Sequence, residues 1–148
     1  MSKHDRTRLL EGYLGQAGMK ILEARGCQQQ SRHAAAVHDC QEAIELFAKC
    51  VFLVRGRPYP QEHVVPEPDF LKVTAGLPPE ASQLNLPRLY LLHRFWSHFY
   101  SQAKYGLETL GTPAEDLFHY RESELAIAHA AEWQQAITRL RFMLKVDT

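Results

Sequence analysis

Arginine and histidine side chains lie close together in the segment RLYLLHRFWSHFY, residues 88–100. Arg88 is followed by His93, and Arg94 is followed by His98 four residues later. A histidine with an ordinary pKa of about 6.5 can take a proton from a ribose 2′-hydroxyl and return one to a leaving oxygen. An arginine can hold a phosphate and offset the charge that develops on it. The segment therefore carries the residue types that RNA cleavage without a metal ion needs, although such pairs more often mark the polar edge of a core helix.

A second set of polar residues recurs every four positions in the segment HDCQEAIELFAKC, residues 38–50. At about 100° per residue, Gln41, Glu45 and Lys49 lie along one edge of a helix. Glu45 precedes Lys49 by four residues, which is the favourable order for an ion pair. Two interpretations stay open. The stripe is either a solvated face with one weak ion pair or one wall of a cleft between two helices.

Metal and thiol chemistry have weaker support. His33, His38 and Asp39 could supply metal ligands, but no HExxH pairing accompanies them and no fourth ligand stands at a suitable spacing. The chain has three cysteines and no CxxC pair, which is typical of small buried thiols in a reducing compartment. We therefore expect neither a bound metal nor a cofactor.

The elements that must position these side chains are helices. Apolar residues recur at steps of three and four in several segments, and no stretch alternates convincingly with period two. Ser31 and Ser123 are candidate N-caps, Pro87 suits a first helical turn, and Gly56 and Gly106 are candidate ends. The predicted helices cover residues 6–23, 31–56, 87–106 and 123–146.

Residues 57–82 hold six of the eight prolines. Because a bare loop of that length is unusual in a compact domain, we expect a short helical turn at residues 69–74, with Phe70, Leu71 and Val73 packed inward. The sequence predicts a single all-α domain over residues 1–148, an antiparallel up-and-down bundle of four long helices with this proline-rich connector within it.

Composition limits the classes of function. The chain has 148 residues and a formal net charge of zero, so its overall field attracts neither nucleic acid nor a membrane surface. No run approaches the roughly 18 apolar residues of a membrane span. The first residues, MSKHDRTRLLEGY, are charged from the start and lack the apolar region of a signal peptide. We expect a cytoplasmic protein.

The segment AAAVHDCQEAIELFAKCVFLVRGRPYPQEHVV resembles the core signature of the HEPN family. That signature is a helix with a line of polar residues, then a glycine, a proline-bearing turn and a histidine, here Gln41, Glu45, Lys49, Gly56, Pro58 or Pro60, and His63. The segment FYSQAKYGLETLGTPAEDLFHYRESELAIAHAAEWQQAI is also similar to the family, and the resemblance covers most of residues 10–145.

Two positions depart from the family pattern. Lys104 and Tyr105 stand where the prokaryotic subgroup has an Arg-Tyr pair. In the ribonuclease form of the family, a tyrosine follows the motif histidine by two residues, as Tyr100 follows His98 here. With His98 aligned to the motif histidine, His93 stands at the position where the family has an arginine.

The resemblance implies a helical bundle, typically dimeric, that acts as a binding or regulatory module. Family members often work with a nucleotidyltransferase or in a toxin–antitoxin pair, and bind nucleotide or RNA. On this interpretation a groove between the second and third helices is lined by Gln41, Glu45, Lys49, His93, His98, Tyr100 and Lys104, and His63 and Tyr105 are further candidate ligand-binding residues.

Two alternatives remain open. One is a metal-independent endoribonuclease that uses Arg88 or Arg94 with His93 or His98. The other is a purely structural bundle without a ligand.

Overall fold

The structure is a computed structural model that describes residues 1–144. The predicted end of the last helix at Val146 lies outside the described residues. Within residues 1–144 the chain forms helices, and its extended pairing is limited to an isolated bridge between Leu107 and Thr112. The predicted all-α class is confirmed. The α-helices are α1 (Lys3–Gln29), α2 (His33–Val54), α3 (Glu67–Thr74), α4 (Leu86–Ser97), α5 (Tyr100–Tyr105) and α6 (Tyr120–Met143), and the short 3-10 helices are η1 (Pro79–Leu84), η2 (Glu108–Leu110) and η3 (Ala114–Asp116).

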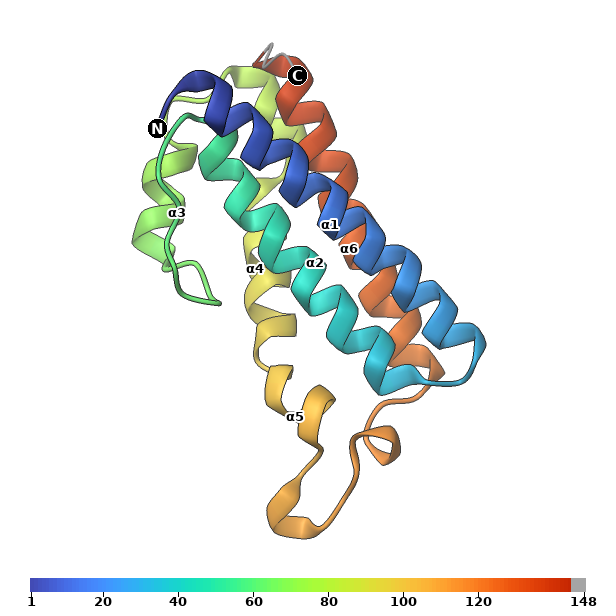
Figure 1. Cartoon of the computed structure of the whole chain (residues 1–148). Coiled ribbons are helices and arrows are strands. Elements are labelled where there is room, and N and C mark those ends of the chain that lie inside the picture. Colours follow the sequence, from blue (N-terminus) through green and yellow to red (C-terminus); the bar gives the residue numbers. More distant parts are fainter. Residues whose placement is uncertain (145–148) are drawn as a thin grey trace.

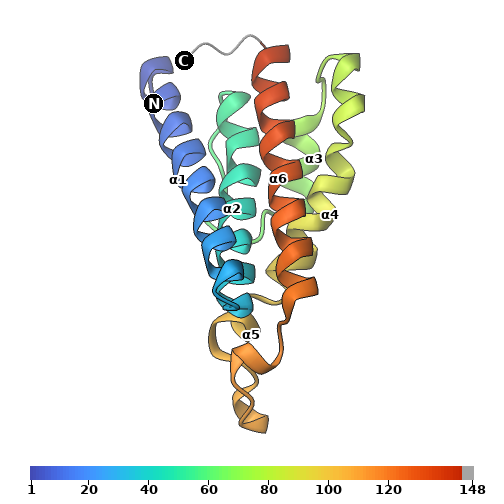
Figure 2. The ribbon, with the colours of Figure 1, turned by 90° about the vertical axis from the view of Figure 1, so that its right-hand side faces the viewer.

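Three long helices and the shorter α4 build a bundle in which the chain direction alternates. Figures 1 and 2 show α1, α2 and α6 side by side, with α4 on the far side of α2 from α1. Phe47 and Ile44 from α2 and Trp133 and Ile137 from α6 are fully buried between these helices. The Trp133 indole N–H donates to the Leu89 carbonyl at 3.0 Å, which ties α6 to α4.

Helix α2 is the central element of the bundle. Its predicted inward stripe is confirmed, because Val37, Ile44 and Phe47 are fully buried. The predicted N-cap at Ser31 is wrong. Ser31 has a φ of +59° in the tight turn after α1, and α2 begins at His33 without a side-chain cap. Helix α2 is stable without a side-chain cap because neighbouring helices bury most of its length, and this packing stabilises it.

The predicted third helix, residues 87–106, is interrupted, so the bundle does not have four long helices. Helix α4 ends at Ser97 and α5 begins at Tyr100. The carbonyl of Trp96 accepts from the Phe99 N–H at 3.0 Å and from the Gln41 side-chain amide at 2.6 Å. A continuous α-helix would pair this carbonyl with the N–H of Tyr100 instead. The extra donor from α2 therefore stabilises the break.

The start of α6 also differs from the prediction. The helix begins at Tyr120, and the His119 N–H donates to the Glu122 carboxylate at 2.9 Å as part of a capping box. Ser123, the predicted N-cap, lies inside the helix and is fully buried. Its Oγ is 3.0 Å from His33 Nδ1 and accepts from the Gln28 amide at 3.3 Å. Ser123 therefore connects α6 to the ends of α1 and α2.

The proline-rich connector folds back onto the bundle. The predicted helical turn is confirmed as α3, with Phe70 and Val73 buried, but Leu71 is 61% exposed and does not pack inward. Fully buried Val65 donates its N–H to His93 Nε2 at 3.1 Å and accepts from the Tyr90 hydroxyl at 2.6 Å. These two contacts fix the loop before α3 against α4.

Across the described part of the chain, no helix combines the length and apolar character that a membrane crossing requires.

Candidate functional site

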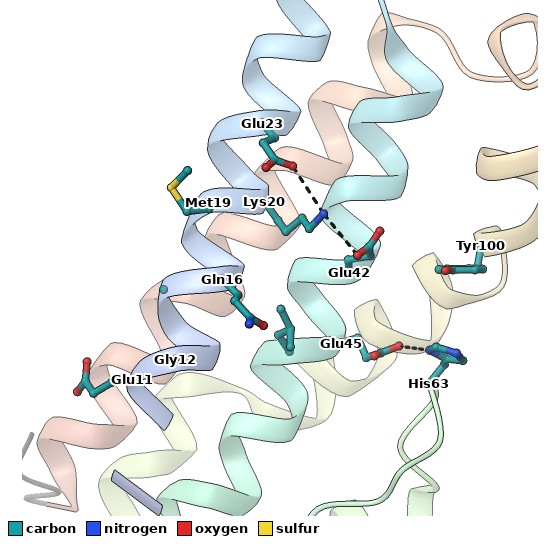
Figure 3. A pocket seen from close by; sticks show the side chains of 12 residues that line it. Glu11, Gly12, Gln16, Met19, Lys20, Glu23, Glu42, Glu45, His63 and Tyr100 are labelled. Atoms are coloured by element: carbon teal, nitrogen blue, oxygen red, sulfur yellow. Dashed lines mark hydrogen bonds and ion pairs between the residues drawn. The ribbon is translucent and has the colours of Figure 1, made fainter. Parts of the chain in front are cut away.

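A groove of about 640 Å³ lies along the outer side of the contact between α1 and α2. Figure 3 shows Lys20, Glu42 and Glu45 in its walls, while His63 and Tyr100 close one end. The loop fixed by Val65 delivers His63, and the start of α5 delivers Tyr100. The break between α4 and α5 therefore has a consequence for the site, because it directs Tyr100 toward α2.

Glu45 is the polar centre of this end of the groove. One carboxylate oxygen lies 2.8 Å from His63 Nδ1, and the other lies 3.4 Å from Lys49 Nζ. The predicted ion pair between Glu45 and Lys49 is confirmed. Only 11% of the Lys49 side chain is exposed, and its ammonium lies 5.7 Å from the centroid of the Tyr59 ring. The pair is therefore a partly buried contact and not a solvated one.

Tyr100 presents an aromatic surface beside these charges. Its ring centroid is 5.7 Å from that of His63, with an interplanar angle of 25°, and 4.9 Å from that of His38, with an angle of 47°. His38 Nδ1 in turn lies 3.0 Å from a Glu42 carboxylate oxygen. The rings of His63 and Tyr100 and the carboxylates of Glu42 and Glu45 thus line this end of the groove, whereas His38 contacts Tyr100 without lining it.

The middle of the groove holds a cluster of charges around Lys20. Its ammonium lies 3.5 Å from Glu42, 3.6 Å from Glu23 and 3.9 Å from Asp39. Burial raises the pKa of Asp39 to about 6, against the opposing effect of Lys20. Burial also lowers the pKa of His38, against the neighbouring Glu42.

The donor atoms of His38, Asp39 and Glu42 lie within 4.8 Å of one another, a spacing that a metal ion could bridge. His38 and Asp39 were candidate metal ligands from the sequence, whereas Glu42 was not. The Lys20 ammonium already provides a positive charge beside both carboxylates. An incoming cation would have to displace it, so the geometry gives a metal ion no clear advantage.

Three residues predicted to line the site lie elsewhere. Gln41 is buried and donates to the Trp96 carbonyl, so it connects α2 to α4. Lys104 and Tyr105 lie at the end of α5, where the Lys104 ammonium sits 5.3 Å from the centroid of the Tyr105 ring. The groove thus receives Glu45, His63 and Tyr100 from the predicted set, with Lys49 beside them.

The arginines and histidines of residues 88–100 do not share a cleft in this chain. His93 is fully buried, and burial lowers its pKa to about 4. Arg88 is paired with Glu132 at 3.1 Å, while Arg94 lies 3.9 Å from Glu67. His98 lies exposed at the end of α4. The expectation that His93 and His98 converge on one wet crevice is therefore wrong for the single chain, because residues five positions apart point about 140° apart around a helix.

Lys20 and Glu42 were not among the residues predicted to form the site. The spacing indicates Glu42, since it stands three residues before Glu45 and therefore shares part of its helix face. Lys20 gave no comparable signal. Its role depends on how α1 packs against α2, which the spacing within either helix does not specify.

No protein-family model matches the chain, and no curated protein matches it. Among solved structures it is similar to TT1696 from Thermus thermophilus, with a TM-score of 0.67 and 20% sequence identity. The match covers 88% of this chain and 97% of that chain. At this identity the likeness shows a shared helical fold and nothing about a ligand.

Proposed function

We propose that the protein is a HEPN-like binding module whose groove takes the base of a nucleotide. The observation that carries the proposal is the position of Tyr100, whose ring lies beside two imidazoles and next to the carboxylates of Glu42 and Glu45. A planar base can stack on such an aromatic surface, which typically contributes about 1–3 kcal/mol per base. The amino and ring N–H groups of a base would donate to the carboxylates.

The charges in the groove favour a base over a chain of phosphates. Glu23, Glu42 and Glu45 face Lys20 in the walls, so carboxylates outnumber ammonium groups there. An extended RNA backbone would be repelled by this surplus. We therefore propose a mononucleotide or a single unstacked nucleotide of an RNA as the ligand, with its phosphate directed toward solvent.

The resemblance to HEPN proteins extends the proposal to partners. A nucleotidyltransferase, or the other member of a toxin–antitoxin pair, is the partner that the resemblance implies. Co-purification of the chain with the product of a neighbouring nucleotidyltransferase gene would test this part independently of the groove.

Titration with the four ribonucleoside monophosphates, followed by NMR shifts of backbone amides, tests the binding proposal. We expect shifts that concentrate on residues around Glu45, His63 and Tyr100. Tyr100→Ala should weaken binding about tenfold by removing the stacking surface. Glu45→Gln should weaken it by removing a charged acceptor. His98→Ala on the outer surface is the matched control and should bind as the unchanged protein does.

We do not extend the proposal to ribonuclease activity, because no observation favours it over binding. Total RNA incubated with the protein in EDTA should stay intact. Cleavage that disappears in His98→Ala, but persists in Tyr100→Ala, would instead support the endoribonuclease alternative.

A further inference from the structure

The imidazole of His63 is held at the end of the groove although most of it is open to solvent. Its side chain is 78% exposed, yet its Nδ1 lies 2.8 Å from a carboxylate oxygen of Glu45. Because an ionised carboxylate only accepts hydrogen bonds, Nδ1 is the donor in this contact. The same ring stacks on Tyr100 with an interplanar angle of 25°. His63 therefore already makes the two contacts that a bound base requires, a stack on Tyr100 and an N–H directed at Glu45 (Figure 3).

The segment that carries His63 is anchored at Val65 and has few contacts before it. Val65 is fully buried and is hydrogen-bonded to α4 through both its N–H and its carbonyl. Residues 61–64 are all exposed, and among the described residues their hydrogen bond is the one between His63 and Glu45. An exposed charge pair of this kind contributes little to stability. The imidazole can therefore leave Glu45 while Val65 stays in place.

The second imidazole beside Tyr100 is held more firmly. His38 belongs to the middle helix α2, its side chain is 18% exposed, and its Nδ1 lies 3.0 Å from a Glu42 oxygen. Its ring centroid is 4.9 Å from that of Tyr100. A base that stacks on Tyr100 needs room beside this ring, where both imidazoles already lie. Because His38 is fixed in a packed helix and His63 is not, His63 is the ring that a ligand can replace.

We propose that His63 holds the place of a guanine base, and that a guanine nucleotide displaces it from Tyr100 and Glu45. This inference rests on the proposed function, because it concerns the same groove. The imidazole gives Glu45 a single N–H donor. Guanine carries a ring N–H and an amino group on neighbouring atoms of one edge, so it can donate to both oxygens of one carboxylate. A guanine therefore gains more from Glu45 than the ring that it replaces.

The other common bases lack this pair of neighbouring donors. Adenine and cytosine place a ring nitrogen acceptor next to their amino group, and uracil places a carbonyl on each side of its ring N–H. Such an acceptor would face the carboxylate and be repelled by it. Glu23 and Glu42 line the same groove, so the acceptors of the protein outnumber its donors there. The groove thus favours the base that presents the most N–H donors on one edge.

Displacement makes His63 a competitor of the ligand and not a contact to it. An imidazole that occupies the site part of the time reduces the apparent affinity by the fraction of protein in which the site is open. If the contact with Glu45 is closed about 80% of the time, removal of the imidazole strengthens binding about fivefold. A histidine that contacted the ligand directly would have the opposite effect, because its removal would weaken binding. The sign of the change therefore separates the two roles.

Calorimetric titration of the full chain with GMP tests the proposal, with His63→Ala as the variant and Gln61→Ala as the matched control. Gln61 is exposed in the same segment and lines a different hollow of the surface. We expect His63→Ala to bind GMP about fivefold more tightly than the unchanged protein, and Gln61→Ala to bind it equally well. Inosine monophosphate, which lacks the amino group, and AMP should bind the unchanged protein at least about tenfold more weakly than GMP.

NMR of the His63 imidazole gives a readout that does not depend on affinity. Its ring protons lie beside Tyr100, so the ring current of Tyr100 shifts their resonances. At saturating GMP these resonances should move to the positions that they have in Tyr100→Ala. Resonances that keep their shifts, or weaker GMP binding by His63→Ala, would overturn the displacement.

The comparison of nucleotides tests the choice of base separately. Equal affinities for GMP, inosine monophosphate and AMP would overturn the assignment of guanine. If neither the unchanged protein nor His63→Ala binds any of the four ribonucleoside monophosphates, the proposed function itself fails, and the displacement of His63 fails with it.

Discussion

Acid should destabilise this protein through His93. The imidazole is fully buried, and its Nε2 accepts a hydrogen bond from the Val65 N–H at 3.1 Å. Only a neutral imidazole can accept this bond. Burial lowers the pKa of His93 to about 4, and the charges of Lys49 and Arg94 act in the same direction. Protonation would place a charge in the core and remove the acceptor that holds the loop carrying His63.

The magnitude follows from linkage. The ordinary pKa of 6.5 applies to the unfolded chain, and the folded value is about 4. At about 1.4 kcal/mol per pH unit, this difference corresponds to about 3 kcal/mol of folding free energy. Because the folded pKa is the lower one, the unfolded chain takes up the proton first as the pH falls. The contribution of His93 to stability is therefore complete above pH 6.5, falls between pH 6.5 and 4, and is lost below that.

Urea unfolding at intervals from pH 7 to pH 4 provides the assay, with His93→Gln as the comparison. The glutamine side-chain oxygen can accept from the Val65 N–H and does not titrate. Asp39 has the opposite effect, since burial raises its pKa to about 6 and its protonation favours the fold, but it is present in both proteins. We expect the unchanged protein to lose about 3 kcal/mol more than the variant over this range. Parallel pH profiles for the two proteins would show that His93 is not the group whose protonation destabilises the fold.

Three further substitutions, at Asn85, Ser123 and Glu45, should change the stability of the fold or the affinity of the groove. Asn85 has a φ of +51°, and its side chain accepts from the Arg88 N–H, so Asn85→Ala should cost about 1–2 kcal/mol in urea unfolding whereas Asn85→Gly should cost a few tenths. Equal losses for the two variants would contradict the role of the left-handed conformation. Ser123→Ala should lower stability by about 1 kcal/mol, because it leaves partly buried polar groups of Gln28 and His33 without their partner. A free energy of unfolding unchanged within error would show that a water molecule takes the place of the Ser123 hydroxyl. Glu45→Gln should lower the melting temperature modestly, because the partly buried Lys49 ammonium loses its charged partner, and should also weaken nucleotide binding; calorimetry measures both properties.

Periodicity predicted the bundle well, since steps of three and four show where a helix must face a core. It was sufficient for α2, whose stripe of apolar residues is buried along its whole length. It also identified α3 within a proline-rich segment. The apolar spacing predicts these helices correctly because it depends only on residues within the same helix.

The interruption between α4 and α5 could not be predicted in this way. Neither glycine nor proline marks the break at residues 98–99. Its cause is a contact from another helix, the Gln41 amide on the Trp96 carbonyl. Propensity cannot anticipate a hydrogen bond between residues that lie 55 positions apart in the chain.

The candidate site was predicted only where its residues share one helix. Glu45 and Lys49 share one helix, and their ion pair followed from spacing. The position of His63 against Glu45 instead depends on the fold of the connector, although the resemblance had selected it. The burial of His93 was missed, although it stands four residues after Leu89 and three before Trp96 and therefore shares their inward face.

Tyr100 and Glu45 together form one end of the proposed nucleotide site, and a double-mutant cycle on affinity measures whether they contact the same ligand. Isothermal titration calorimetry of the mononucleotide that binds best would be compared for the unchanged protein, Tyr100→Ala, Glu45→Gln and the double variant. We expect each single change to weaken binding and the two effects to be non-additive, because both residues would contact the same base. If the unchanged protein binds the nucleotide and neither variant alters the affinity, the ligand lies elsewhere and the proposed site is wrong.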